Sequence, residues 1–306
     1  MRIGLDLRLH AYAPGGISRY ARRLAEHLAP LLPPEALHLF YHRKEEAPLD
    51  VRQAQTHRLW TPPHHRLERW ALGAELFPQD LDLFHSTDFI PPAWGARHVV
   101  ITVHDLNFLY YPQYLTNEAR RYYNEQIEWA VDHADHILAD SYATKDDLES
   151  LLDVEAERIT VVHLAADSSF RPLSDEEAHP VGERYQLEPG YLLFVGTLEP
   201  RKNVPGLLLG YRMLLDNKVS HAPLVLVGGK GWLYEEIFDR VEALNLSEHV
   251  RFLHQVPDAD LPGLYSAASV LAAPSFYEGF GLPALEAMSC GTPVVVADRA
   301  SLPEVV

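Results

Sequence analysis

Two glutamates stand eight positions apart in the stretch YEGFGLPALEAMSCGTPVV, residues 277–295. Glu278 lies among glycines, and Glu286 is the only charged residue of the apolar segment 282–290. A carboxylate accepts hydrogen bonds from two adjacent hydroxyls, as on a ribose or a sugar ring. The pair therefore predicts a site for two diols. The alternative is one glutamate that complements a helix dipole and a second that faces water.

The residues between the glutamates predict a loop followed by a helix. Pro283 suits the start of a helix and Gly291 suits its end. Glycine in the loop lets backbone approach a ligand closely, and the free N–H groups at a helix N-terminus favour phosphate. We therefore expect the loop and helix start to cradle a diphosphate through Gly279, Phe280, Gly281 and Leu282.

Two adjacent cations, Arg201 and Lys202, stand in VGTLEPRKN (195–203), which begins at the end of an apolar run and contains Gly196. The carboxyl ends of strands are where open α/β folds bind ligands. Arginine grips phosphate as a fork and lysine as a point charge, so the pair would neutralise a pyrophosphate leaving group. The alternative is a solvated loop in which Asn203 caps the next helix.

Two further glycine-rich turns follow predicted strands. Gly15 and Gly16 in APGGISRYARRL (13–24) would let backbone approach phosphate or sugar, and Gly228 in GGKGW (228–232) would frame the nucleotide. The first turn is not G-x-G-x-x-G, so it does not favour a nicotinamide cofactor. Its alternative is a simple strand-to-helix connection.

Histidines are candidates in two places. His104 and Asp105 in TVHDLNF (102–108) sit at a predicted strand exit and would hydrogen-bond a sugar hydroxyl; the alternative for His104 is a structural role. Asp140 and Ser141, at another strand exit, indicate a helix cap. The histidines of HRLWTPPHHRLERW (57–70) lack the spacing of a metal site, and we interpret this stretch as a loop or acceptor-side surface.

Apolar runs alternate with helical patterns along the chain, which indicates parallel sheets covered on both faces. The expected strands are 2–7, 81–86, 98–105, 136–140, 158–164, 191–197, 223–229, 250–256, 269–275 and 293–298. The expected helices are 17–28, 117–134, 142–152, 181–187, 204–216, 233–245, 258–268 and 282–290. A polar, proline-containing segment, 171–190, interrupts the pattern. The fold class is therefore α/β, with two facing doubly wound, Rossmann-like domains, 1–172 and 173–306.

The composition narrows the function classes. The chain has 306 residues and a formal net charge of −17, which argues against a general nucleic-acid binder. The single cysteine, Cys290, excludes an intrachain disulfide and fits a reducing cytoplasm. The first ten residues lack the apolar core of a signal peptide, and no apolar run reaches the roughly 18 residues of a membrane span.

The motifs, taken in their order along the chain, resemble the retaining glycosyltransferases of family 4, which have the GT-B fold. EGFGLPALEAMSCGTPVV matches that family's E-x7-E motif, and GTLEPRKN and the early GG turn follow its pattern. VHDLNFLYYPQYLT and HADHILADSYATKDDL resemble its mannosyltransferase-like branch, known from O-antigen and other polysaccharide assembly.

This resemblance implies a role for each candidate. Glu286 would bind the donor ribose and Glu278 the donor sugar hydroxyls. Arg201 and Lys202 would hold the diphosphate, Gly16 would pack under the phosphates, and His104 would touch the sugar near the reacting carbon. The family's donors are UDP- or GDP-sugars. No divalent metal is required, because cationic side chains and a helix N-terminus stabilise the negative charge of the diphosphate that a metal ion would otherwise neutralise.

Two departures from the family pattern stand out. Thr197 follows the strand glycine where many members carry arginine, so Arg201 would carry more of the phosphate charge. The chain also ends at Val306 within SLPEVV, where family members continue, and we therefore expect an incomplete second domain.

The function expected from these features is transfer of a hexosyl group, with mannosyl as the leading expectation, from a nucleotide-sugar donor to a glycan or lipid-linked acceptor hydroxyl. The alternatives are a nucleotide-sugar epimerase of the same fold and a non-catalytic nucleotide-sugar-binding module. We expect a cytoplasmic protein. Arg19, Arg22 and Arg23 on the first helix fit either a contact with the inner membrane face or an ordinary solvated surface.

Overall fold

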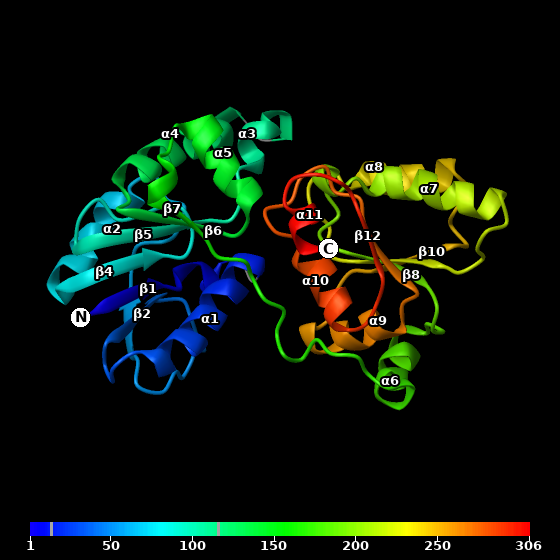
Figure 1. Cartoon of the computed structure of the whole chain (residues 1–306), viewed down its shortest axis with the longest axis horizontal. Helices are drawn as coiled ribbons and strands as arrows, with labels where there is room; N and C mark the ends of the chain where they lie inside the picture. Colours follow the sequence, from blue (N-terminus) through cyan, green and yellow to red (C-terminus); the bar gives the residue numbers. More distant parts are fainter. Residues whose placement is uncertain (13–14, 115–116) are drawn as a thin grey trace. The chain divides into compact units, whose positions relative to one another are not determined.

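All the strands that the structure describes are parallel and form two sheets, one of seven strands and one of five. The structure is a computed structural model that describes residues 1–12, 15–114 and 117–306. The chain divides into two units, residues 1–162 and 163–306, each built around one sheet (Figure 1). Residues 13–14 of the APGG turn and 115–116 of the VHDLNFLYYPQYLT stretch lie outside the described ranges.

The sheet of the first unit has the order β3-β2-β1-β4-β5-β6-β7. Its strands are β1 (Ile3–Asp6), β2 (Leu37–His42), β3 (Gln55–Leu59), β4 (Leu81–Ser86), β5 (Ala96–Val103), β6 (His136–Ala139) and β7 (Ile159–Val161). The α-helices are α1 (Gly16–Leu28), α2 (Glu68–Leu76), α3 (Asn107–Tyr110), α4 (Asn117–His133) and α5 (Tyr142–Leu152). The order reverses between β1 and β4, which is the topological switch point of this sheet.

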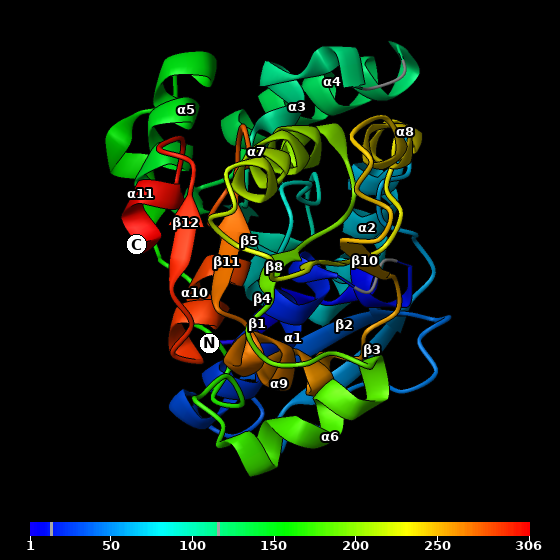
Figure 2. The ribbon, with the colours of Figure 1, turned by 90° about the vertical axis from the view of Figure 1, so that its right-hand side faces the viewer.

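The sheet of the second unit has the order β10-β9-β8-β11-β12 and reverses between β8 and β11, which lie side by side in Figure 2. Its strands are β8 (Leu192–Val195), β9 (Leu224–Val227), β10 (Val250–Leu253), β11 (Val270–Ala273) and β12 (Val294–Val296). The α-helices are α6 (Asp175–Tyr185), α7 (Val204–Asp216), α8 (Glu235–Ala243), α9 (Leu261–Ala267), α10 (Leu282–Ser289) and α11 (Leu302–Val305).

Alternating side chains of the central strands build a core on each face of the second sheet. Leu193 and Val225 belong to the cluster that contains α9 and α10 residues, whereas Phe194 and Leu224 belong to the cluster formed with α7 and α8. Figure 1 shows these two pairs of helices on opposite faces of the sheet. Burial on both faces explains why the strands are apolar throughout, as expected for parallel strands.

Helices also cover both faces of the first sheet. Leu5 of β1 packs in a cluster with Ala21 and Ala25 of α1. Phe40 and Phe84 pack in a second cluster that contains α2 residues. A third cluster joins β5 and β6 to α4 and α5. The sequence-based fold class, α/β with two Rossmann-like domains, is confirmed for each unit. None of the described helices combines the length and hydrophobicity needed to span a bilayer.

Two local features differ from expectation. The units meet between Val162 and His163, ten residues before the expected boundary, because Phe170 is already buried in the core of the second unit. The helix expected at 181–187 begins at Asp175, where a capping box forms between Ser174 and Glu177.

The segment from 29 to 80 holds most of what the periodicity missed. It contains β2, β3 and α2, none of which was expected. The prediction of a loop at 57–70 was therefore wrong at both ends, because β3 ends at Leu59 and α2 begins at Glu68. β3 is an edge strand with the polar sequence QTHRL, so it carries little of the apolar signal that marks the central strands.

A buried ion triad ties the end of β1 to the start of α2. The Arg8 guanidinium is 1% exposed and donates to both carboxylate oxygens of Asp6, to Glu68 Oε1 at 2.7 Å and to the carbonyl of Thr61 at 3.1 Å. Burial alone would lower the pKa of Arg8, but the two carboxylates outweigh it and raise that pKa. All partners are satisfied, so removing the cation alone would leave two buried carboxylates without a counter-charge.

We expect Arg8→Met to destabilise the first unit by about 3–5 kcal/mol because Asp6 and Glu68 lose their shared counter-ion. This corresponds to a fall of its thermal unfolding midpoint on the order of 10 °C, measurable by calorimetry. The control is Arg97→Ala, which removes an exposed pair with Asp82 and should shift the midpoint little. Equal shifts for the two variants would contradict a structural role for the triad.

Candidate functional site

The loops that follow β8 and β9 are joined through their backbones. Leu198 N donates to Gly229 O at 2.9 Å, and Gly231 N donates to Leu198 O at 3.1 Å. Gly228 has φ +151°, and a Cβ there would lie 1.9 Å from Gly196 O. No other residue type fits so close an approach, which explains the glycine at the expected donor-binding position 228.

The loop that follows β8 is joined in turn to the loop that follows β11. Asn203 precedes α7 with φ 53° but makes no side-chain cap; its Nδ2 instead donates to the carbonyl of Pro274 at 3.1 Å. Phe276 N donates to Arg201 O at 2.9 Å. Asn203 is therefore the N-cap residue of α7, as the alternative expected, but its side-chain amide binds the neighbouring loop and forms no cap hydrogen bond.

Arg201, Lys202 and Glu278 meet at the carboxyl edge of the second sheet, where β8 and β11 define its switch point. Lys202 Nζ lies 2.6 Å from Glu278 Oε1, and Arg201 NH1 lies 2.8 Å from Glu278 Oε2. Ser275 Oγ donates to Glu278 Oε1 at 2.6 Å. The three charged side chains are only 11–16% exposed, so their mutual attraction is screened less than at a surface.

The charge of Glu278 is fixed by this cluster. Burial alone would raise the pKa of its carboxyl group, but Lys202 and Arg201 outweigh burial and lower that pKa to about 2. Glu278 is therefore ionised at neutral pH. It can accept hydrogen bonds, but it holds no proton to donate.

Glu199, which the sequence analysis did not select, completes the cluster. Its Oε1 accepts from Arg201 Nε and NH2 at 3.1 and 2.8 Å, and its Oε2 accepts from Trp232 Nε1 at 3.1 Å. Arg201 NH1 also donates to Tyr277 O at 2.9 Å. Glu199 thus orients Arg201 and links it to the loop after β9. Its place two residues before Arg201 in GTLEPRKN was the available signal.

The loop before α10 is held by a residue far along the chain. Ser301 Oγ lies 2.8 Å from Glu278 O and 2.9 Å from Phe280 O. Gly281 has φ +107°, and a Cβ there would approach Leu302 to 2.8 Å. Gly279 and Phe280 are buried, and Leu282 begins α10. The loop that carries Glu278 is therefore fixed on both sides of the glutamate.

Glu286 is the fifth residue of α10, about one turn into the helix as expected, and is 4% exposed. Its Oε2 accepts a hydrogen bond from the hydroxyl of Tyr265 at 2.9 Å. The structure thus brings Arg201, Lys202 and Glu278 into direct contact and places Glu286 against α9.

His104 in the first unit is held by two acceptors. Its Nδ1 lies 2.6 Å from Asp140 Oδ2, and its Nε2 lies 2.9 Å from Thr87 O. Burial alone would lower the pKa of the imidazole, but Asp140 outweighs it and raises that pKa to about 9. A doubly protonated ring fits both acceptors, so His104 is a fixed positive charge at neutral pH.

The neighbours of His104 separate two expectations. Ser141 caps α5, accepting from Thr144 N at 3.1 Å, as predicted. Asp140 is the counter-ion of His104 instead of a cap.

Gly15 is the cap residue of α1 and Gly16 its first residue, both exposed. Asp105 accepts from Asn107 N in a local turn. No group of three or more histidine, cysteine or acidic residues placed to hold a metal occurs among the described residues.

Comparison with known families decides the assignment. Residues 14–170 match the model of Glycosyltransferase Family 4, and residues 175–306 match that of Glycosyl transferases group 1. The chain belongs to glycosyltransferase family 4.

Curated relatives of this family 4 chain include two O-antigen enzymes. O-antigen chain mannosyltransferase B of Escherichia coli is 41% identical over 244 residues, which are 79% of this chain and 63% of the relative. O-antigen chain mannosyltransferase RfbU of Salmonella typhimurium is 32% identical over 66% of this chain and 52% of its own length. The chain thus spans less than two thirds of either relative.

Solved structures show the same GT-B glycosyltransferase fold. Sucrose-phosphate synthase from Thermosynechococcus elongatus superimposes with a TM-score of 0.76 at 23% identity, covering 99% of this chain and 82% of that one. WaaG, a glycosyltransferase involved in lipopolysaccharide biosynthesis, gives 0.75 at 17% identity, with 99% and 83% covered. Anabaena Alr3699/HepE, solved with UDP and glucose, gives 0.74 at 19% identity, with 100% and 83% covered.

We expect Gly228→Ala to push the loops after β8 and β9 apart, because its Cβ would overlap the carbonyl of Gly196. The cost should be about 2–3 kcal/mol of unfolding free energy for the second unit, measured by calorimetry. The matched control is Gly229→Ala, since a Cβ there meets nothing within 4 Å. A stable Gly228→Ala protein would show that the backbone contact is dispensable.

Proposed function

We propose that this chain transfers a hexosyl group, most simply mannosyl, from a nucleoside diphosphate sugar to a hydroxyl of a glycan or lipid-linked glycan, with retention of anomeric configuration. The observation that carries the proposal is the meeting of Arg201, Lys202 and Glu278 at the β8–β11 switch point. The mannosyltransferase names of the two O-antigen relatives support the choice of sugar.

The cationic pair is suited to a departing diphosphate. Arg201 and Lys202 are adjacent and held at the same edge of the sheet, so they can meet two phosphate oxygens once these displace the Glu278 carboxylate. The backbone N–H groups at the start of α10 add positive potential close to Glu278 in the chain. Glu278 would accept hydrogen bonds from hydroxyls of the donor hexose once the diphosphate takes its place on the cations.

The transfer step follows from this charge distribution. The bond from the anomeric carbon to the phosphate oxygen breaks, and a bond from that carbon to the acceptor oxygen forms on the same face. The acceptor proton passes to the phosphate oxygen that leaves. Arg201 and Lys202 stabilise the negative charge that grows on the diphosphate, and the sugar is oxocarbenium-like at the transition state.

Retention through the same face is favoured over a covalent intermediate on Glu278. A carboxylate whose pKa is about 2 and which is neutralised by two cations is a weak nucleophile. The same reasoning applies to Glu199, which is bound to Arg201. Both carboxylates are therefore assigned to positioning, and neither is assigned to attack on the sugar.

The remaining expected roles complete the proposal. Glu286 would exchange its contact with Tyr265 for the donor ribose. His104, held positive by Asp140, would lie near the donor sugar, with Gly15 and Gly16 at the phosphates. No divalent metal is needed, because the two cations perform the electrostatic part.

Location at the membrane is a secondary proposal. On α1, Arg22 NH1 lies 3.1 Å from His10 Nε2 and Arg23 NH1 lies 2.7 Å from Glu26 Oε2, so part of the helix charge is used internally. We propose a cytoplasmic protein with at most a weak peripheral contact at the inner membrane face. Sedimentation with anionic vesicles measures that contact.

The test supplies GDP-mannose and UDP-glucose separately and follows release of GDP or UDP. We expect nucleotide release to require a donor and to increase with mannoside acceptors. Release should continue in excess EDTA, which removes divalent metal ions. NMR of the first-formed product should show the anomeric configuration of the donor. A product with inverted anomeric configuration would contradict the same-face mechanism. Complete loss of turnover with EDTA would contradict the proposal that no metal is needed.

We expect Glu278→Gln to bind free GDP or UDP more tightly than the unaltered chain, on the order of tenfold, because the competing carboxylate no longer occupies Arg201 and Lys202. Transfer should fall at least 100-fold because the hexose loses an acceptor. Calorimetric titration and initial rates measure the two effects. The control is Asp216→Asn, whose exposed pair with Arg212 lies on α7. Weaker nucleotide binding by Glu278→Gln would contradict the exchange.

A further inference from the structure

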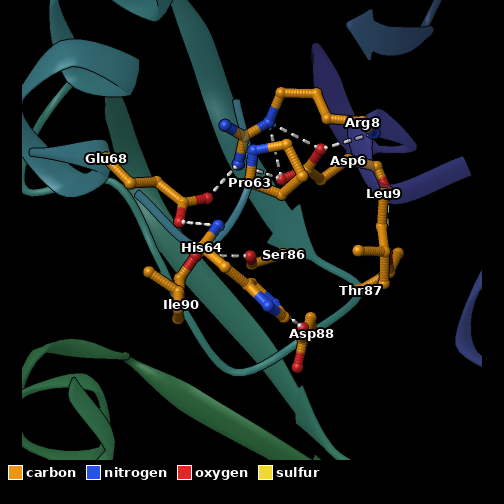
Figure 3. A pocket seen from close by; sticks show the side chains of 10 residues that line it. All are labelled: Asp6, Arg8, Leu9, Pro63, His64, Glu68, Ser86, Thr87, Asp88 and Ile90. Atoms are coloured by element: carbon orange, nitrogen blue, oxygen red, sulfur yellow. Dashed lines mark hydrogen bonds and ion pairs between the residues drawn. The ribbon is translucent and has the colours of Figure 1, made fainter. Parts of the chain in front are cut away.

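The first unit has its own switch point, between β1 and β4, and a small cavity lies there. The five strands of the second sheet repeat the order of β3-β2-β1-β4-β5 in the first, and in open parallel sheets ligands bind outside the carboxyl ends of the strands at the switch point. The cavity has a volume of about 20 Å³ and is lined by, among others, Asp6, Arg8, His64, Glu68, Thr87 and Asp88 (Figure 3). Such a volume admits one water-sized group, for example a single hydroxyl.

The charges around the cavity disfavour an anionic ligand. Arg8 is the cation deepest in its wall, and all three guanidinium nitrogens donate to Asp6, Glu68 or the carbonyl of Thr61. Three carboxylates, those of Asp6, Glu68 and Asp88, belong to the same wall. A phosphate would have to displace a buried carboxylate from Arg8, which costs several kcal/mol, whereas a neutral hydroxyl would leave the contacts of Arg8 in place.

At the edge of the cavity, His64 and Asp88 form a pair that can bind a hydroxyl. His64 Nε2 lies 2.7 Å from Asp88 Oδ2, and the two side chains are 34% and 17% exposed. The second oxygen of Asp88 accepts from Phe89 N at 2.7 Å. A hydroxyl that enters this hydrogen bond would accept from the histidine N–H and donate to the carboxylate, so both members of the pair keep a partner.

The ion triad fixes where this pair stands. Glu68 bonds Arg8 through Oε1, and its Oε2 accepts from the backbone N of His64 at 2.6 Å. Figure 3 shows this line of contacts running from Arg8 through Glu68 to His64 and Asp88. The ring of Tyr123 stands edge-on to His64, with centroids 6.2 Å apart. Thr87, the residue before Asp88, accepts from His104 through its carbonyl.

We propose that this cavity and the His64–Asp88 pair form a subsite for one hydroxyl of a neutral acceptor sugar, with Asp88 accepting from the hydroxyl and His64 donating to it. The proposal rests on the proposed function, since it supplies the acceptor for that transfer. It deepens that function by assigning the acceptor a neutral carbohydrate at this position, and by naming the two side chains that recognise it.

The first test measures binding without turnover. Methyl α-mannopyranoside and inorganic phosphate are titrated separately into the chain with ¹⁵N-labelled histidine, and the His64 imidazole signals are assigned by their loss in His64→Ala. We expect the mannoside to shift the His64 signals and phosphate to leave them unchanged. A phosphate-induced shift without a mannoside-induced one, or no shift with either probe, overturns the proposal.

The second test separates acceptor recognition from donor chemistry. His64→Ala and Asp88→Asn should raise the KM for octyl α-mannoside on the order of tenfold, while the KM for GDP-mannose and its hydrolysis without acceptor stay unchanged. His64→Gln, which keeps a donor, should recover part of the loss. The control is His65→Ala, a neighbouring exposed histidine outside the cavity wall.

The outcomes distinguish two failures. If the KM for the acceptor is unchanged in both variants, the subsite is overturned and the proposed function stands. The same holds if the variants lose acceptor-free hydrolysis of the donor to the same degree as transfer. If the unaltered chain releases no nucleotide from any donor, the proposed function itself fails, and the assignment of the subsite to an acceptor fails with it.

Discussion

The contact of two adjacent cations with one buried carboxylate is the constraint on which the second unit's loops depend. Charges withdrawn from water are tolerated only when paired, and breaking such a pair by removing one member costs about 3–5 kcal/mol. Arg201 and Lys202 follow β8, whereas Glu278 follows β11, so the pairing closes the switch point. The bonds made by Glu199, Ser275 and Ser301 hold the partners in register. The site is therefore assembled, and its two cations are balanced by the carboxylates of Glu278 and Glu199.

The same sheet topology serves two kinds of chemistry. Around β8 and β11, glycine-lined backbone and cations suit a polyanion. Around β1 and β4, the described charges are paired with one another, and the groups at the surface are a histidine and a carboxylate. Strand order decides where a ligand site can form. The side chains that follow each strand decide what the site accepts.

Much of the architecture could be predicted because most central strands are buried on both faces and largely apolar. β2, LHLFYH, is central and buried but was missed, since its two histidines interrupt the apolar run. α5 and α7 begin and end at the predicted residues. β3 could not be found in this way, since an edge strand such as QTHRL is half solvated. α6 could have been found from Ser174 and Glu177, whose spacing is that of a capping box.

In the candidate site, too, some residues could be identified from the sequence and others could not. Arg201, Lys202 and Glu278 carry a local signal of charge beside glycine, and their meeting follows once both strands belong to one parallel sheet. Asp140 has no glycine beside it, and the only signal for Glu199 is its place two residues before Arg201. Their partners are fixed by side-chain geometry across neighbouring loops, which one-dimensional spacing does not encode. The His64–Asp88 pair joins residues 24 positions apart and depends on the Glu68 contact to the backbone, so the sequence offered three histidines without a reason to prefer one.

The close approach of Gly228 to Gly196 also bears on which positions of these two loops can vary. Main-chain hydrogen bonds hold the loops together, and the hydrogen bond between Glu199 and Trp232 adds a side-chain link. The exposed side chains of Thr197 and Lys230 take part in neither kind of link. These two positions can therefore be substituted while the spacing of the loops is kept.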